Sequence, residues 1–340
     1  MTTSVISARL PPDIDLTKAT LAYGNRALPR LNRELNDATL LTRQKSVRML
    51  CDYLHDPQNI AGALREGITV SLKKLLADSD ITVRQKSTEC LYVIAGHAIG
   101  REAFLREGII VPLSKLFDDS EDIARLNAHL AFEMLSKSPT GAEGIVEAKL
   151  VPTLVKKLKI EHDEIKELIL DTLHFCMFEE TQSALDSEAM EVFTELLQHK
   201  SSSIRGKAAR DIMDLSVPLN GKNRAVEVKC VPVLVDLLKD TCTDVRANAA
   251  GALMMITITT KGKYTALASD AIAPLVSLVD DPTSEVRVNA VKALTCLSEA
   301  PEGRKALSDH VEKIKARTEE EVPAVVKAAN CAASVITWKP

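Results

Sequence analysis

Aromatic residues are scarce in this chain of 340 residues. Only 3 % of its positions are Phe, Trp or Tyr, and Trp338 is the single tryptophan. Hydrophobic residues nevertheless make up 46 % of the sequence, so the core must consist mainly of Leu, Val, Ile and Ala. Side chains of these types suit stacked helices, and burying them offsets the conformational entropy that is lost on folding. We therefore expect an ordered helical protein.

The features of secreted and membrane proteins are also missing. The first ten residues, MTTSVISARL, contain neither the basic nor the apolar stretch of a signal peptide. The longest apolar run, around AAGALMMITI, is about half the length that a bilayer span needs. The seven cysteines are scattered, and no two form a CxxC pair. We interpret them as reduced thiols of a soluble intracellular protein.

Catalytic and metal-binding motifs are absent from the sequence. HExxH, GxSxG and GxxxxGK(S/T) do not occur, and the seven histidines never pair at ligand spacing within a helix. His129 and His174 fall in predicted long helices and could line a groove, although a single histidine is more often structural. The acidic runs at 118–122 and 319–321 read as solvated turns. We predict that the protein is not an enzyme and uses no cofactor, metal or small-molecule substrate.

The charge balance gives no reason to expect nucleic acid as a partner. The chain has 43 basic and 47 acidic residues, for a net charge of -4, whereas phosphate backbones favour strongly basic faces. With membranes and nucleic acids both disfavoured, other proteins are the expected partners.

A basic residue recurs along the chain at an almost constant interval. The steps between successive positions are 41, 41, 41, 39, 41, 41 and 40 residues. The residues are Arg43, Arg84, Arg125, Lys166, Arg205, Arg246, Arg287 and Lys327. A period near 40 is typical of solenoids with two or three helices per repeat. We interpret these residues as structural markers that bind turn carbonyls or acids such as Asp244 and Glu285, rather than as a basic binding stripe.

Each period has the same internal pattern. In 230–256 a short apolar helix, CVPVLVDLL, leads through an acidic turn into a long amphipathic helix, DVRANAAGALMMI. A shorter third segment follows, as in NIAGALREG at 59–67. Gly67 and Gly108 are expected to end helices with positive φ. Prolines should lie in the first turn of the next helix, at Pro112, Pro152, Pro232 and Pro274.

These segments resemble the armadillo consensus over residues 27–340. The resemblance implies an all-α, right-handed superhelical solenoid of about seven repeats and a C-terminal partial cap. We expect an N-terminal extended leader at 1–25 and one elongated domain at 26–340. The repeats are placed at approximately 26–67, 68–108, 109–149, 150–188, 189–229, 230–269 and 270–309, with the cap at 310–340. The fourth repeat departs from the others, because its step is 39 and KKLKIEHDEIKE is expected to join its second and third helices.

Armadillo proteins that hold extended peptides, such as importin alpha and beta-catenin, place an Asn near the end of the long helix of each repeat. Importin alpha adds a Trp four residues earlier. Here the Asn places hold Asp52, Val93, Met134, Phe175, Asp214, Met255 and Cys296. The Trp places hold Arg48, Glu89, Leu130, Asp171, Arg210, Gly251 and Lys292. Without amide side chains to donate to and accept from a peptide main chain, this binding mode is disfavoured.

The same positions nominate a binding site. Lys45, Arg48, Lys207 and Arg210 contribute charge. Next to the short-stepped repeat, an apolar patch is expected from Leu130, Met134, Leu168 and Phe175. Our hypothesis is that this patch binds an amphipathic helix or a folded domain. The alternative is that the fourth repeat is rotated, so that the four residues join the core.

The segment before the repeats carries a second resemblance. LPPDIDLTKATLAYGNRALPRLNREL at 10–35, followed by LLTRQKSVRMLCDYLHDP at 40–57, resembles the radial spoke head 14 family of armadillo proteins. This resemblance implies a structural scaffold subunit of the radial spoke in the axoneme of motile cilia and sperm flagella. Such a subunit, part of the cytoskeleton, binds other spoke proteins and supports motility. The alternative is a soluble armadillo adaptor or transport receptor that binds peptides or helical segments in its concave groove.

Overall fold

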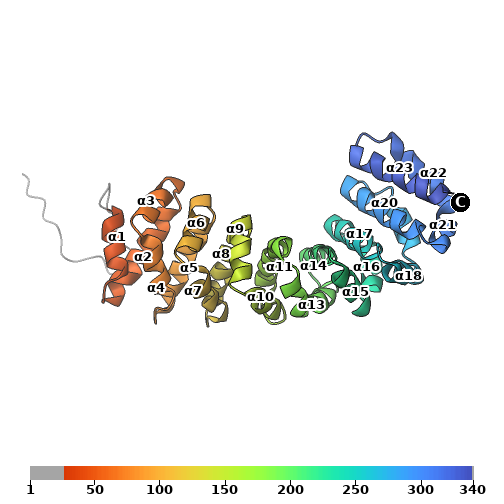
Figure 1. Cartoon of the computed structure of the whole chain (residues 1–340). Helices are drawn as coiled ribbons and strands as arrows, with labels where there is room; N and C mark the ends of the chain where they lie inside the picture. Colours follow the sequence, from red (N-terminus) through yellow and green to blue (C-terminus); the bar gives the residue numbers. More distant parts are fainter. Residues whose placement is uncertain (1–26, 339–340) are drawn as a thin grey trace, which may run out of the picture. The chain divides into compact units, whose positions relative to one another are not determined.

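The computed structural model describes residues 27–338, which form α-helices and short 3-10 helices without a strand among them (Figure 1). The predicted leader at 1–25 lies outside these residues. Contacts divide the chain into two compact units, the first ending at Gly144 and the second beginning at Ile145. The regular repeat interval does not predict this division. Within the described residues, no helix is long and apolar enough to cross a membrane.

The first unit repeats the order short helix, long helix, short helix. Its elements are α1 (Ala27–Leu35), α2 (Leu40–Leu54), η1 (Pro57–Asn59), α3 (Ile60–Arg65), α4 (Ile68–Leu75), α5 (Ile81–Ala95), α6 (Ala98–Arg106), α7 (Ile110–Ser114), η2 (Lys115–Asp118) and α8 (Asp122–Ser136). The long helices α2, α5 and α8 pack against one another in turn. Helix α9 (Pro139–Glu147) crosses from the first unit into the second.

The second unit continues the same order and ends with the predicted cap. Its elements are α10 (Val151–Leu158), α11 (Asp163–Glu179), α12 (Gln182–Asp186), α13 (Ala189–Leu196), α14 (Ser202–Leu215), α15 (Leu219–Glu227), α16 (Cys230–Leu237), α17 (Thr243–Ile256), α18 (Thr260–Ala268), α19 (Ile272–Leu278), α20 (Ser284–Ser298), α21 (Pro301–Leu307), η3 (Ser308–His310), α22 (Val311–Lys315), η4 (Ala316–Glu319) and α23 (Pro323–Thr337). The long helices α11, α14, α17, α20 and α23 form one layer, each against the next (Figure 1).

The core follows from the helical spacing of apolar residues. In α17, Val245, Ala249, Leu253 and Ile256 are fully buried, as their spacing predicts. Aliphatic side chains dominate the buried set throughout, with a few phenylalanines among the largest. The layered helices thus bury one face each and leave the other for solvent or partners.

The turns between repeats use a left-handed residue before the next short helix. Gly67 and Gly108 have φ of 69° and 61°, as expected. The equivalent places in later repeats are also left-handed, although they are not glycine: Lys149, Glu188, Lys229 and Asp270 have φ between 54° and 62°. An L-residue in this region is less stable than glycine by about 1 kcal/mol. The turn geometry is therefore set by the stacked helices rather than by the residue type.

The fourth repeat differs from its neighbours in two helices. Its long helix α11 has 17 residues, against 14 in α14, and its third helix α12 has only five, against nine in α15. The stretch KKLKIEHDEIKE covers the end of α10 and the start of α11. It therefore joins the first and second helices, and the expectation that it joins the second and third is wrong. The third helix is the one that is shortened.

The recurrent arginine joins successive repeats. Arg246 lies at the start of α17, and its Nη1 donates to the carbonyls of Asp240 and Thr241 at 2.9 and 3.1 Å. Its Nε lies 2.9 Å from Asp281 Oδ2, in the turn of the next repeat. The same arrangement is formed by Arg43 with Asp78, Arg84 with Asp119, Arg205 with Asp240 and Arg287 with Glu320.

These contacts correct the identity of the acidic partners. The turn carbonyls are the expected ones, whereas the carboxylates come from the following repeat and not from Asp244 or Glu285. In the fourth and fifth repeats, the positions equivalent to these turn carboxylates are occupied by Ile160 and His199. Arg125 pairs at 2.6 Å with Asp122 of its own helix. The arginine-to-acid contact, which we call the repeat clamp, is thus a property of the regular repeats.

Replacing Arg246 with Ala should lower the free energy of unfolding by about 2 kcal/mol, because it removes charge-assisted hydrogen bonds from a mostly buried guanidinium. Arg246→Lys should restore only part of this loss, because an ammonium group cannot reproduce the planar fork. Urea unfolding followed by circular dichroism measures the effect. Lys261→Ala, which removes an exposed ion pair to Glu227, is the control and should change little. Equal losses in both variants would contradict the clamp.

Replacing Lys229 with Gly should raise the free energy of unfolding by about 1 kcal/mol, because glycine adopts a φ of 60° without strain. The measurement is the shift of the urea midpoint. Val228→Gly is the matched control, since its φ of -80° suits any residue. That variant should be destabilised, because glycine loses more backbone entropy on folding. A stability loss in Lys229→Gly would argue against stored strain at these turns.

Candidate protein-binding surface

Exposed apolar side chains gather at the C-terminal ends of the long helices in the second unit. Phe178, Val217 and Ile258 are 64 %, 60 % and 53 % exposed. They occupy equivalent places, 39 and 41 residues apart, at or just beyond the ends of α11, α14 and α17. Because these helices pack side by side, the three residues form a row. Recurrent exposed apolar groups of this kind mark protein-binding surfaces.

A pocket extends this row toward the C-terminal cap. Its volume is about 450 Å³, and side chains of α17, α20 and α23 line it. Met254, Met255 and Ile258 form one wall, while Cys296 and Ala328 lie on the facing helices. Methionines adapt their shape to different partners, which suits a docking site. Since Ile258 belongs to both features, we treat the row and the pocket as one apolar surface, made of Phe175, Phe178, Val217, Met254, Met255, Ile258 and Cys296.

The four residues of the predicted apolar patch are divided between the two units. Leu130 and Met134 lie on α8 in the first unit, and Leu168 and Phe175 lie on α11 in the second. All four are half-buried, so the alternative in which they join the core is wrong. Phe175 packs near Phe178, with ring centroids 6.4 Å apart. A continuous patch across the two units stays a prediction, whereas Phe175 belongs to the apolar surface.

The predicted charged positions of the second unit are occupied by ion pairs. Lys207 Nζ lies 2.6 Å from Asp171 Oδ2, and Arg210 Nη1 lies 3.0 Å from the other oxygen of the same carboxylate. These contacts join α14 to α11. Both cations are half-buried, so a partner would have to replace existing pairs to use them. Lys45 and Arg48 lie half-buried on α2 in the first unit, and their binding role stays a prediction.

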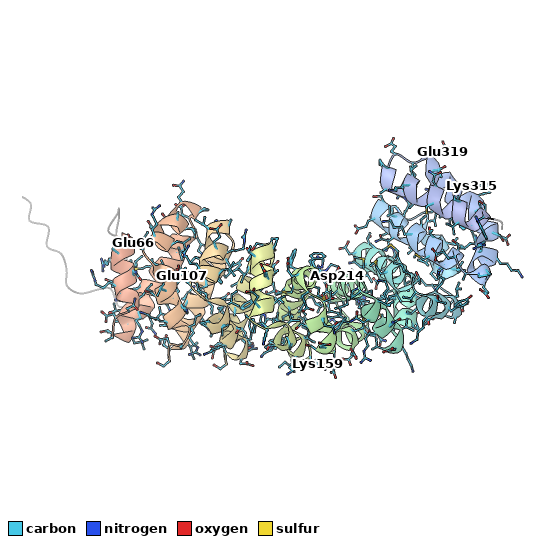
Figure 2. All side chains as sticks on the ribbon, viewed as in Figure 1. Glu66, Glu107, Lys159, Asp214, Lys315 and Glu319 are labelled. Atoms are coloured by element: carbon cyan, nitrogen blue, oxygen red, sulfur yellow. The ribbon has the colours of Figure 1, made fainter. Side chains whose placement is uncertain are left out.

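Next to these pairs lies a buried carboxylate. Asp211 is fully buried on α14, and Arg210 Nη2 lies 2.9 Å from its Oδ1. Burial raises the pKa of Asp211 well above its usual range, and the negative charge of Asp214 adds to this rise, while Arg210 opposes it. Asp214, near the end of α14 (Figure 2), lies 2.6 Å from His174 Nδ1.

The two histidines of the long helices differ in their surroundings. His129 is fully buried and stacks on Phe117 with ring centroids 4.1 Å apart, so the expectation that it lines a groove is wrong. His174 is partly exposed beside the apolar surface, and its ring centroid lies 4.6 Å from that of Phe178. The repeat interval distinguishes the two histidines. The residues at the position of His129 in the next two repeats are Leu170 and Ala209, and both are buried.

Phe178, Val217 and Ile258 were not predicted from the sequence, because they lie at neither of the two positions per long helix at which armadillo proteins carry Asn and Trp. The repeat interval could have found them, since the three residues are apolar at equivalent positions just where each helix ends. The buried thiols offer no nucleophile: burial raises the pKa of Cys176 and of Cys230 to about 12.

Comparisons with known proteins agree with the repeat architecture. A family model described as HEAT repeats matches residues 190–295. An engineered protein of known structure is similar over 92 % of this chain and 79 % of its own, with a TM-score of 0.84 and 25 % identity. A second engineered protein covers 67 % of this chain and 96 % of its own, with a TM-score of 0.63 and 25 % identity.

A designed armadillo repeat protein, solved in complex with the peptide (KR)4, covers 67 % of this chain and 99 % of its own. Its TM-score is 0.62 at 22 % identity, a likeness that concerns the fold alone. The predicted fold class is confirmed by these matches. The chain is an α-helical repeat solenoid of the armadillo and HEAT kind, an architecture typical of non-enzymatic scaffolds that bind other proteins.

Proposed function

We propose that this chain is a non-catalytic scaffold subunit of the radial spoke in the axoneme of motile cilia and sperm flagella. The apolar surface of the second unit carries the binding part of the proposal, because it offers a recurrent docking face on a repeat scaffold. The assignment to the spoke is supported by the resemblance of 10–35 and 40–57 to the radial spoke head 14 family. Other spoke subunits are then its partners.

The chemistry of the surface favours a partner with a folded backbone. The places where peptide-binding relatives carry Asn hold Phe175, Asp214, Met255 and Cys296 in the second unit. None of these side chains is an amide that can both donate to and accept from an extended main chain. An amphipathic helix has already paired its own backbone groups and needs only apolar contact. We therefore expect a helix or a folded domain on this face.

Two lysines at the pocket indicate the charge of such a partner. Lys292 of α20 and Lys327 of α23 are exposed and border the apolar pocket. A partner helix with an apolar stripe and flanking acidic residues matches this border. The designed armadillo protein described above binds (KR)4, a basic peptide, and this surface is suited to the opposite charge.

The alternative is a soluble armadillo adaptor or transport receptor. The methionine-lined pocket favours this possibility, because methionine surfaces bind several helical partners. Both functions use the same surface, so they differ in where the protein is found rather than in how it binds. A spoke scaffold is expected to remain bound to the axoneme, whereas a soluble adaptor is expected in the soluble fraction.

Fractionation separates the two functions. Isolated axonemes are washed with detergent and then extracted with increasing salt, and the chain is detected with an antibody in every fraction. We expect it to stay with axonemes through the detergent wash and to leave them together with spoke subunits at high salt. A tubulin blot and a soluble cytosolic marker are the controls. Recovery in the soluble fraction alone would exclude the spoke assignment and favour the adaptor.

Replacing Phe178 with Asp tests the apolar surface itself. Partner capture from an axonemal extract by the purified chain should fall at least about tenfold, because a charge replaces the largest exposed apolar side chain of the row. Val111→Asp is the matched control, since Val111 is 54 % exposed but lies on α7, in the first unit. Circular dichroism must show unchanged helix content in both variants.

Phe175→Asp and Met134→Asp extend this test to the predicted patch. If the patch is continuous, both variants lose the partner; if only the apolar surface of the second unit binds, Phe175→Asp alone does. Equal capture by the wild-type chain and by all three aspartate variants of the binding face would show that partners dock elsewhere.

A further inference from the structure

The second unit contains a group of polar side chains that protein docking does not explain. His174 on α11 and Asp211 and Asp214 on α14 each bring one possible ligand atom within 4.8 Å of the others. The two aspartates lie three residues apart, so they share one face of α14. Figure 2 labels Asp214, which lies near the end of that helix. A ring nitrogen and two carboxylates thus converge from two packed helices.

One atom of this group lacks the partner that its burial demands. Asp211 is 0 % exposed, and its Oδ1 accepts a hydrogen bond from Arg210 Nε at 3.0 Å. Its Oδ2 is buried and has no hydrogen-bond partner. Buried carboxylate oxygens are normally paired, because leaving one unpaired costs several kcal/mol. The unpaired oxygen indicates that something else binds there.

The surrounding charges indicate a cation. Two cationic side chains, Lys207 and Arg210, form ion pairs with carboxylates in this region. Three carboxylates pair with them, those of Glu167, Asp171 and Asp211, while the carboxylate of Asp214 pairs with His174. Acidic groups are in excess at Asp211 and Asp214, because Arg210 is shared with Asp171 and the partner of Asp214 is His174. A divalent ion would offset this excess.

We propose that His174, Asp211 and Asp214 bind a divalent transition-metal ion, and that Zn²⁺ fits this donor set best. Zinc accepts imidazole nitrogen and carboxylate oxygen together, whereas Mg²⁺ and Ca²⁺ prefer oxygen ligands alone. Three protein ligands leave a fourth position for water or for a side chain of a partner. On binding, the ion takes the place of the hydrogen bond between His174 Nδ1 and Asp214 Oδ2, which now lie 2.6 Å apart. The proposal does not depend on the spoke assignment.

The neighbouring aromatic rings give the site a structural consequence. His174 lies edge-on to Phe178 at 4.6 Å and near Phe175 at 5.1 Å. Fixing the imidazole on a metal would restrict both rings, which belong to the apolar surface. An ion at this place would therefore hold one end of that surface in a defined shape.

A second group of possible ligands, in the first unit, is a weaker candidate and a useful comparison. Cys51 lies in the last turn of α2, His55 follows directly after that helix, and Glu89 of α5 is nearby. His55 is 59 % exposed, and Lys86 Nζ already binds Glu89 at 2.7 Å. Neither His55 nor Glu89 has a buried side-chain nitrogen or oxygen atom without a hydrogen-bond partner. This group has no requirement for an ion.

The test uses the full-length chain after treatment with a chelator. Isothermal titration calorimetry with ZnCl₂ should show one equivalent bound, and zinc should raise the melting temperature. Asp211→Asn and His174→Gln should each weaken zinc binding at least about tenfold, because each removes one of three ligands. His55→Gln, the matched control in the other group, should bind like the wild-type chain.

Cobalt provides a readout of the ligands themselves. Co²⁺ bound to the wild-type chain should give visible absorption bands that are displaced by Zn²⁺ but not by Mg²⁺, and these bands should change in His174→Gln. Circular dichroism of each metal-free variant must match the wild-type spectrum. If Asp211→Asn does not fold, His174→Gln alone decides. The proposal is overturned if the wild-type chain binds no zinc, if both variants bind it normally, or if His55→Gln removes it.

Discussion

The ion pair between the arginine of one repeat and the turn carboxylate of the next is the interaction on which the regular stack depends. Arg246 holds two carbonyls of its own turn and reaches Asp281 across the junction. It thereby fixes the start of one long helix relative to the following turn. In a solenoid each repeat contacts only its neighbours, so the geometry within each unit is set junction by junction. The positions of all side chains on the exposed face of the long helices follow from these junctions.

The fourth repeat replaces this interaction with another. His199 occupies the position of the turn carboxylate, and Lys166 occupies the position of the recurrent arginine. Here α11 and α14 are joined instead by Asp171 of α11, which forms ion pairs with Lys207 and Arg210 of α14 near the middle of the helices. The contact has moved from the turn to the exposed face. As a result, charged and buried polar groups collect beside Phe175 and Phe178, on the part of the chain where the repeat is irregular.

The sequence predicts the regular part of this arrangement and misses the irregular part for a physical reason. Periodicity, Gly67 and Gly108 are enough to predict the helices and their turns, because those features are local. The left-handed Lys229 carries no local signal, since stacking imposes its φ. The pairing of Lys207 with Asp171 is likewise hidden, because it joins residues 36 positions apart whose distance depends on how two helices pack. Burial of Asp211 has the same origin.

The replacement of amide side chains on this face limits the kinds of partner that it can hold. Of the four Asn-equivalent residues in the second unit, only Asp214 is charged, and it is already bound to His174. Met255 and Phe175 offer area but no directed hydrogen bonds, so an extended chain placed here would leave its backbone groups without partners. A helix avoids this penalty because its backbone is paired internally. The binding energy must then come from buried apolar area, and the selectivity from how well a partner's side chains match the shape of the row and the pocket.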